Sequence, residues 1–215
     1  GWCFPQNMAH YNNYIDFNNA SPQTIEDWKK TYLFLLKKIT MFHQGKQLIL
    51  KNQDNTGKIP QLLEMFPDAK FIYMYRNPYD LYMSMLKFMR KVIPLYCVQT
   101  PPPLKDVEDH MVTLFTHMTK KYLQDKSLIP QENLAEIRYE DFITQPLKTV
   151  NTLYKKFNLD GYQDIESSFK SYLATQKTIH MDNYTFTDSI KKRIENHWGF
   201  ALKEYQYTHP QEENR

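Results

Sequence analysis

Two short apolar runs, separated by one helix-length segment, constrain the fold of this chain more than any other feature. Residues 47–51 (QLILK) and 70–75 (KFIYMY) each have the length of a strand, and residues 56–66 between them have helical character. Strands joined by a helix over so short a stretch pair in parallel, with a right-handed crossover. The sequence therefore predicts an α/β fold in which helices flank a parallel β-sheet.

The remaining segments extend this alternation. Ser21 and Pro22 are typical of an N-cap and a first helical position, and they predict a helix that ends near Gly45. Residues 135–139 (AEIRY) predict a third strand. Further helices are predicted at residues 78–92, 104–125, 141–159, 164–175 and 187–205. We expect a single domain at residues 1–215, with an irregular segment at 1–20, a core at 21–207 and a tail at 208–215.

Composition excludes several classes of protein. The chain is 41% apolar and 24% charged, as expected of a globular domain. Its net charge of +3 is small and argues against a nucleic-acid surface, and its longest apolar runs fall far short of the roughly 20 residues of a transmembrane segment. The two cysteines, Cys3 and Cys97, have no metal-binding spacing. We therefore expect no metal and a reducing, cytoplasmic location.

Candidate binding residues follow the predicted strands. Ligands of parallel α/β sheets bind at the carboxyl ends of the strands, and these ends carry Lys51, Arg76 and Tyr139. Arg76 precedes a helix on which Ser84 lies two turns further on, so a guanidinium and a hydroxyl are both available to a phosphate. A structural interpretation is also open, in which Arg76 pairs with Asp80 and Ser84 only packs.

A phosphate-binding loop is missing from this pattern. Thr56-Gly57-Lys58 resembles the end of a Walker A motif, but Asn52 stands where the first glycine belongs and Ile59 replaces the Ser or Thr. None of the other glycines has the required spacing after a strand. We therefore reject a Walker A loop within this chain.

Together these segments resemble the sulfotransferases that use 3′-phosphoadenosine 5′-phosphosulfate (PAPS), and in particular their bacterial branch. The resemblance rests on three stretches and covers nearly all of residues 1–207: LILKNQDNTGKIPQLLEMFPDAKFIYMYRNPYDLYMSM, RYEDFITQPLKTVNTLYKKFNL and IENHWGFALKEYQY. It implies a P-loop NTPase-like sulfotransferase fold. Members of this family begin with a glycine-rich phosphosulfate loop, so we expect this chain to lack that N-terminal region.

The resemblance implies a role for individual residues. Arg76 and Ser84 match residues that hold the 3′-phosphate of PAPS, and Tyr139 matches a residue at the adenine. Lys51 matches the lysine that reaches the sulfonate and stabilises the leaving phosphate. Lys177 matches, more loosely, a C-terminal basic contact to the 3′-phosphate.

One departure from the family concerns the general base. Many members have a catalytic histidine two residues after the lysine, where this chain has Gln53. The neighbouring Asp54 is a candidate base, since some bacterial members have Glu there, and it is equally a candidate loop or cap residue. His180, near Lys177, is a further candidate to approach the acceptor, and a surface or packing role is the alternative.

The implied activity is transfer of a sulfonate group from PAPS to a hydroxyl or amine acceptor, with carbohydrate as the first expectation and lipid as the second. The family needs no metal. Two other functions stay open at this point. One is a nucleotide or small-molecule kinase, which shares the parallel sheet, and the other is a non-catalytic binding or scaffold protein that keeps the sulfotransferase fold.

Overall fold

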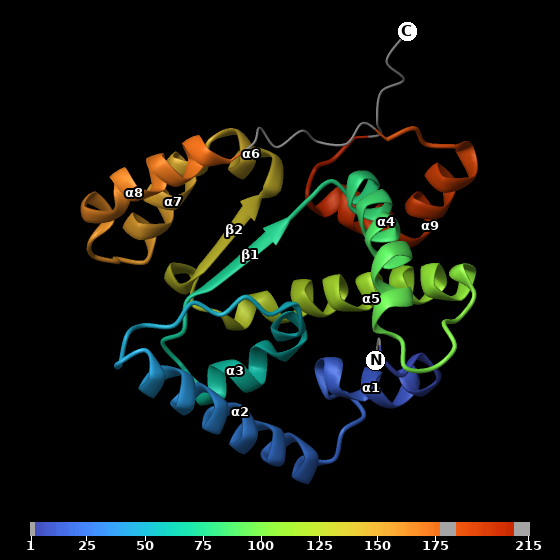
Figure 1. Ribbon diagram of the computed structural model, residues 1–215, viewed down its shortest axis with the longest axis horizontal. Helices are drawn as coiled ribbons and strands as arrows, with labels where there is room; N and C mark the ends of the chain where they lie inside the picture. The colour runs from blue at the N-terminus through green and yellow to red at the C-terminus, as the bar shows by residue number, and fades with distance from the viewer. Residues whose placement is uncertain (1–2, 177–183, 209–215) are drawn as a thin grey trace, which may run out of the picture. The chain divides into compact units, whose positions relative to one another are not determined.

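The computed structural model describes residues 3–176 and 184–208 of the 215-residue chain (Figure 1). Within them, strands β1 (Phe71–Tyr75) and β2 (Leu134–Arg138) lie side by side and pair in parallel. Phe71 is opposite Leu134 at one end of the pair and Tyr75 is opposite Arg138 at the other. Helices precede and follow each strand, so the expected α/β fold with a parallel sheet is confirmed.

Most of the described residues are helical. The α-helices are α1 (Met8–Asp16), α2 (Pro22–Phe42), α3 (Ile59–Met65), α4 (Pro78–Tyr96), α5 (Leu104–Asp125), α6 (Tyr139–Thr144), α7 (Pro146–Lys156), α8 (Tyr162–Thr175) and α9 (Asp188–Glu204). Short 3₁₀ helices occupy Pro5–Asn7, Gln53–Lys58, Lys126–Leu128 and Gln131–Asn133. Ser21 caps α2 as predicted, because its side chain accepts a hydrogen bond from the amide of Thr24.

The strand predicted at residues 47–51 is wrong. This segment has no regular secondary structure, and the side chains of Ile49 and Leu50 are 90% and 44% exposed. A strand exists only when a neighbour completes its hydrogen-bond ladder, and β1 pairs with β2 instead. Apolar character without a partner strand was not enough to place this segment in the sheet.

Two other boundaries differ from prediction. The segment expected to be irregular, residues 1–20, contains helix α1. The helix predicted at 141–159 is divided at Gln145, whose backbone leaves the helical region directly before Pro146. Proline disfavours the helical conformation in the residue that precedes it, which explains the division into α6 and α7.

The described chain divides into two compact units. Unit 1 comprises Gly1–Ala69 and Met89–Leu128, and unit 2 comprises Lys70–Phe88 and Ile129–Arg215. The single domain at 1–215 stays a prediction. None of the helices that the structure describes combines the length and the apolar character needed to cross a membrane.

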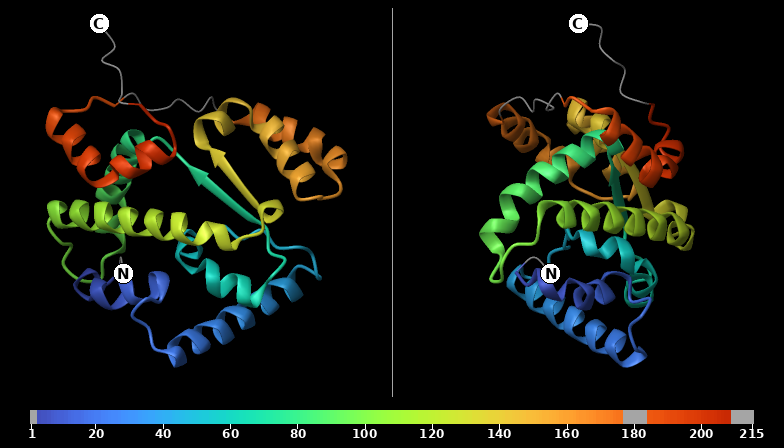
Figure 2. Two further views of the ribbon diagram at one scale, coloured as in Figure 1. Left: turned by 180° about the vertical axis from the view of Figure 1, so that it is seen from behind. Right: turned by 90° about the vertical axis from the view of Figure 1, so that its right-hand side faces the viewer.

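In unit 1, α3 lies between α2 and α5 (Figure 2). Buried side chains of α3 and α5 form its core, among them Ile59, Met111, Val112 and Tyr122. Lys58 is also buried, and its Nζ donates to the carbonyl oxygens of Ile15 (3.0 Å) and Asp54 (3.1 Å). A lysine thus joins the end of α1 to the 3₁₀ helix that precedes α3.

In unit 2, the first turns of α4 pack against α9 (Figures 1 and 2). Tyr82 and Trp198 are almost fully buried, and their rings meet edge to face with centroids 5.6 Å apart. Tyr79 is buried beside them, and its hydroxyl donates to a carboxylate oxygen of Glu195 at 3.1 Å. Burial, followed by this bond, raises the pKa of Tyr79 to about 12. The first turns of α4, which follow the end of β1, are therefore firmly held.

Candidate functional site

The parallel register brings two of the predicted residues together at the carboxyl end of the sheet. Tyr75 is opposite Arg138, so the residues that follow them, Arg76 and Tyr139, leave adjacent strands at the same level. The guanidinium carbon of Arg76 lies 4.7 Å from the centre of the Tyr139 ring, which is a cation–π contact. Arg76 and Tyr139 therefore share one site in unit 2.

A single carboxylate ties the two strand ends to each other. Glu140, in the first turn of α6, accepts a hydrogen bond through Oε1 from the backbone amide of Asn77 (3.0 Å). Asn77 in turn caps α4, because its side-chain oxygen accepts from the amide of Tyr79 (3.0 Å) and Pro78 occupies the first helical position. The residues on both sides of Arg76 are thus anchored, and its main chain is placed by two elements.

The other oxygen of Glu140 binds the C-terminal segment. Tyr207 donates its hydroxyl proton to Oε2 at 2.7 Å, and Nε of Arg138 lies 3.5 Å from the same oxygen, close enough for an ion pair but poorly placed for a hydrogen bond. The guanidinium carbon of Arg138 lies 4.5 Å from the centre of the Tyr207 ring. Burial, followed by the bond to Glu140, raises the pKa of Tyr207. Tyr207 therefore stays protonated and keeps its donor role.

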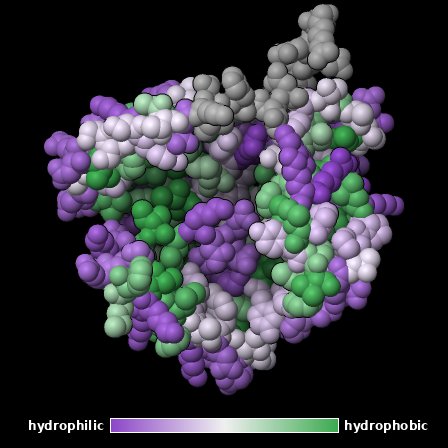
Figure 3. Space-filling model, in the orientation of Figure 1, coloured by the Kyte–Doolittle hydropathy of each residue, from purple (hydrophilic) through white to green (hydrophobic). Residues whose placement is uncertain are grey.

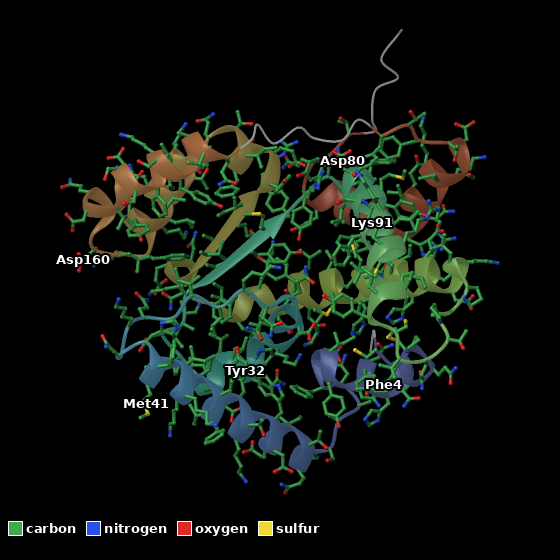
Figure 4. The ribbon with its side chains drawn as sticks, in the orientation of Figure 1. Phe4, Tyr32, Met41, Asp80, Lys91 and Asp160 are labelled. Carbon is green, nitrogen blue, oxygen red and sulfur yellow. The ribbon has the colours of Figure 1, made fainter. Side chains whose placement is uncertain are left out.

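Arg76 itself has an unused donor. Its Nε is buried and has no hydrogen-bond partner among the residues that the structure describes. Asp80, four residues further on in α4 (Figure 4), is the partner of Arg76 in the structural interpretation of the sequence, yet no ion pair or hydrogen bond joins the two within the described ranges. A buried guanidinium donor without a partner is costly, and an anion bound beside it would remove that cost.

Asp80 is affected by this environment. Its carboxyl is half-buried, and burial raises its pKa above the ordinary value. The nearby charge of Arg76 opposes that shift, and the charge of Glu140 adds to it. The site therefore combines a fixed positive charge on Arg76 with a carboxylate that holds its proton more strongly than an exposed one.

The other predicted site residues belong to unit 2, to unit 1 or to the residues outside the described ranges. Ser84 is half-buried on α4, in the same unit as Arg76. Lys51 and Asp54 belong to unit 1, and both are exposed. Asp54 lies in a 3₁₀ helix, where its amide donates to the Asn52 side chain and its carbonyl accepts from Lys58. Lys177 and His180 lie outside the residues that the structure describes.

Sequence reasoning missed the central role of Glu140. The signal was present, since Glu140 follows the second strand just as Arg76 and Asn77 follow the first. The contribution of Tyr207 had no local signal, because it is far along the chain and reaches the site only in the fold. No group of His, Cys, Asp and Glu suited to a metal occurs among residues 3–176 and 184–208.

Comparison with known proteins places this chain in a family. The chain is 29% identical over 205 residues to omega-hydroxy-beta-dihydromenaquinone-9 sulfotransferases of Mycobacterium bovis and Mycobacterium tuberculosis. The match covers 95% of this chain and 52% of each relative, so the chain spans about half the length of the curated relatives it matches. No solved structure matches it. The model of the sulfotransferase family matches residues 4–164, and the chain therefore belongs to that family.

Proposed function

We propose that unit 2 binds PAPS through the carboxyl end of its parallel strands and that the chain is the nucleotide-binding part of a sulfotransferase. The observation that carries this proposal is the buried, unpartnered Nε of Arg76 at that end of the sheet. An arginine offers a permanent charge and forked donors, which suit a phosphate group. Such a donor fits the 3′-phosphate, the group that distinguishes PAPS from ATP.

Three residues of unit 2 would hold the nucleotide. Arg76 and Ser84 would contact the 3′-phosphate, and Tyr139 would contact the adenine. The cation–π contact with Arg76 supports the role of Tyr139, because it places an aromatic ring beside the phosphate-binding charge. Glu140 acts as a positioning residue, since it holds the main chain next to Arg76 through Asn77.

When bound, PAPS supplies the sulfonate group and leaves as adenosine 3′,5′-bisphosphate. We propose that Lys51 stabilises charge on the leaving phosphate and that Asp54 takes the proton of the acceptor. The exposure of both side chains leaves them free to meet a ligand. Lys177 stays a proposed contact to the 3′-phosphate.

For the acceptor, we propose the hydroxyl group of an apolar, lipid-like molecule. The two relatives are named for an omega-hydroxy-beta-dihydromenaquinone, which favours this class over the carbohydrate expected first. Both relatives come from mycobacteria, which supports the expected bacterial origin. The sequence has only two cysteines, Cys3 and Cys97, which supports the reducing, cytoplasmic location that we propose.

Calorimetric titration with adenosine 3′,5′-bisphosphate tests the nucleotide site, with AMP and ATP as competing ligands. We expect the bisphosphate to bind more tightly than AMP or ATP, and Arg76→Ala to abolish that preference. Arg90→Ala, which removes an exposed arginine, is the matched control. Tighter binding of ATP would favour the kinase, and equal binding of all three nucleotides would contradict a 3′-phosphate site.

A further inference from the structure

Helix α2 carries exposed apolar side chains on the side that faces away from its core contacts. Phe34 and Leu35 are 59% and 50% exposed, and Met41 and Phe42 are 85% and 83% exposed. The two pairs are seven residues apart, which is close to two helical turns, so they lie on the same side of α2. We call these four residues, together with Lys30, Lys37 and Lys38, the outer face of α2.

The opposite side of α2 makes the tertiary contacts. The Tyr32 hydroxyl accepts a hydrogen bond from the side chain of Asn55 at 3.1 Å, and Lys29 pairs with Glu64 of α3 at 2.6 Å. Figure 4 shows Tyr32 directed toward α3 and Met41 directed away from it. The outer face is therefore an apolar surface separate from the contacts that hold α2 in unit 1.

Lysines interrupt and border this apolar surface. Lys37 and Lys38 lie between the two apolar pairs, and Lys30 lies one turn before Phe34; all three side chains are exposed. The Nζ of Lys38 lies 4.6 Å from the centre of the Phe34 ring. Figure 3 shows hydrophobic and hydrophilic residues side by side at the surface in the region of α2. Long lysine stems of this kind cover apolar surface and keep their charges at its edge.

The charge along the outer face is mainly positive, and Asp27, seven residues before Phe34, is the acidic residue on the same side of α2. Residues 28–53 contain six lysines and neither aspartate nor glutamate. The net charge of the whole chain is only +3, so the rest of the chain is net negative and the positive charge is concentrated on and next to α2. A partner of this surface must offer negative charge over a wide area and also an apolar phase for Phe34, Leu35, Met41 and Phe42.

We propose that the outer face of α2 binds the surface of an anionic lipid bilayer, with the helix lying along the interface. Interfacial helices combine large apolar side chains with lysines on the flanks, and anionic headgroups attract each lysine while the acyl boundary receives the apolar groups. The alternation of apolar and lysine pairs along α2 meets both requirements. This inference goes beyond the proposed function, and it would bring the enzyme to an apolar acceptor if the proposed lipid class is right.

Vesicle co-sedimentation of the full chain tests the proposal without any nucleotide. Vesicles of phosphatidylglycerol with phosphatidylcholine should retain the chain, and pure phosphatidylcholine should retain far less. Each lysine near an anionic surface contributes about fivefold in partitioning, so Lys37→Gln/Lys38→Gln should weaken binding by about 25-fold. Phe34→Ser/Met41→Ser should weaken binding to both vesicle types.

The chain offers matched controls for both variants. Lys155→Gln/Lys156→Gln removes an exposed lysine pair from the last turn of α7, and it should leave binding unchanged. Leu95→Ser/Tyr96→Ser removes an apolar pair that is 80% and 58% exposed, close to the exposure of Met41 and Phe34, and should also leave binding unchanged. Circular dichroism of each variant checks that α2 remains folded.

Three outcomes would overturn the proposal. They are absence of binding to anionic vesicles, equal losses in the controls, and a change from dimer to monomer in Phe34→Ser/Met41→Ser without vesicle binding. The last of these would assign the outer face to a second copy of the chain. Because the assay needs neither PAPS nor Arg76, its failure is distinguishable from failure of the proposed function.

Discussion

The guanidinium of Arg76 rests on the ring of Tyr139, 4.7 Å from its centre, although 62 residues lie between them in the chain. The parallel pairing of Tyr75 with Arg138 produces this contact, because each of the two residues directly follows a paired position. The contact holds one face of the guanidinium and leaves its buried Nε without a hydrogen-bond partner among the described residues. Arg76 is thus positioned by the fold but not neutralised by it.

We expect Arg76 to contribute to ligand affinity much more than to stability. Arg76→Ala should weaken binding of adenosine 3′,5′-bisphosphate by about 10-fold to 100-fold, since hydrogen bonds to charged groups contribute about 1.5–3 kcal/mol. Arg76→Lys keeps the charge but loses the forked donors. Its affinity for the bisphosphate should lie between those of the unchanged chain and Arg76→Ala. Calorimetric titration measures both effects.

The stability of the same variants provides the control. Arg76→Ala should change the free energy of unfolding by less than about 1 kcal/mol. It loses the cation–π contact with Tyr139 and the attraction to Asp80, but it also removes a buried donor that has no partner among the described residues. A larger loss of stability, in step with the loss of affinity, would show that Arg76 is a structural residue and would contradict its role as a ligand contact.

In contrast to Arg76, Glu140 should contribute strongly to stability. Glu140→Ala removes the acceptor for both the Asn77 amide and the Tyr207 hydroxyl, and we expect it to lower the free energy of unfolding by about 2–4 kcal/mol. Glu140→Gln keeps one oxygen acceptor and should cost less. Urea unfolding measures the difference, and Asp141→Asn, an exposed neighbour in α6, is the control. Equal stability of Glu140→Ala and the unchanged chain would rule out a clamp between the strand ends.

The sheet was predictable where local sequence was sufficient. Residues 70–75 and 135–139 are apolar runs followed by a helix start, and strands β1 and β2 lie within one residue of the predicted positions. Residues 47–51 have the same apolar character but no partner strand, and pairing is a tertiary property that a local run does not encode. Arg76 and Tyr139 came together as predicted because they follow strands that do pair.

The remainder of the site could not be predicted because it depends on long-range contacts. Glu140 has three different neighbours, and one of them, Tyr207, lies 67 residues further along the chain. Lys58 is similar. The sequence gives no sign of its burial among the carbonyls of Ile15 and Asp54, which depends on the position of α1.

Asp80 should give the stability of the chain a specific pH dependence. Burial raises its folded pKa above the ordinary value of 3.8, so the folded state holds the proton after the unfolded state has lost it. Stability is therefore lost as pH rises through the interval between the two pKa values. Asp80→Asn lacks this titration, and its stability relative to the unchanged chain should increase with pH across the acidic range.

Urea unfolding at a series of pH values from about 4 to 7 measures this difference. The charge of Arg76 lowers the pKa of Asp80, so the same comparison in an Arg76→Met background should show a larger increase. If the stability of Asp80→Asn relative to the unchanged chain decreased as pH rises, the Asp80 pKa would be lowered in the folded state, contrary to expectation.

Replacing Gly57 or Gly199 by alanine should change the stability of the chain in opposite directions. A Cβ at Gly57 would lie 2.5 Å from the backbone oxygen of Ile15, the same oxygen that accepts a hydrogen bond from Lys58. Backbone cannot yield as a flexible side chain does, so Gly57→Ala must displace the end of α1 and should cost about 1–3 kcal/mol of unfolding free energy.

Gly199 is the matched site, because it lies inside α9 and a Cβ there would meet no atom within 4 Å. Gly199→Ala should therefore stabilise the chain by about 0.5–1 kcal/mol, through the lower backbone entropy of alanine in the unfolded state. Urea unfolding of both variants measures the contrast. If Gly57→Ala were also neutral or stabilising, the close approach of α1 to the 3₁₀ helix would be absent in solution, and the buried Lys58 would lose its acceptor on Ile15 as well.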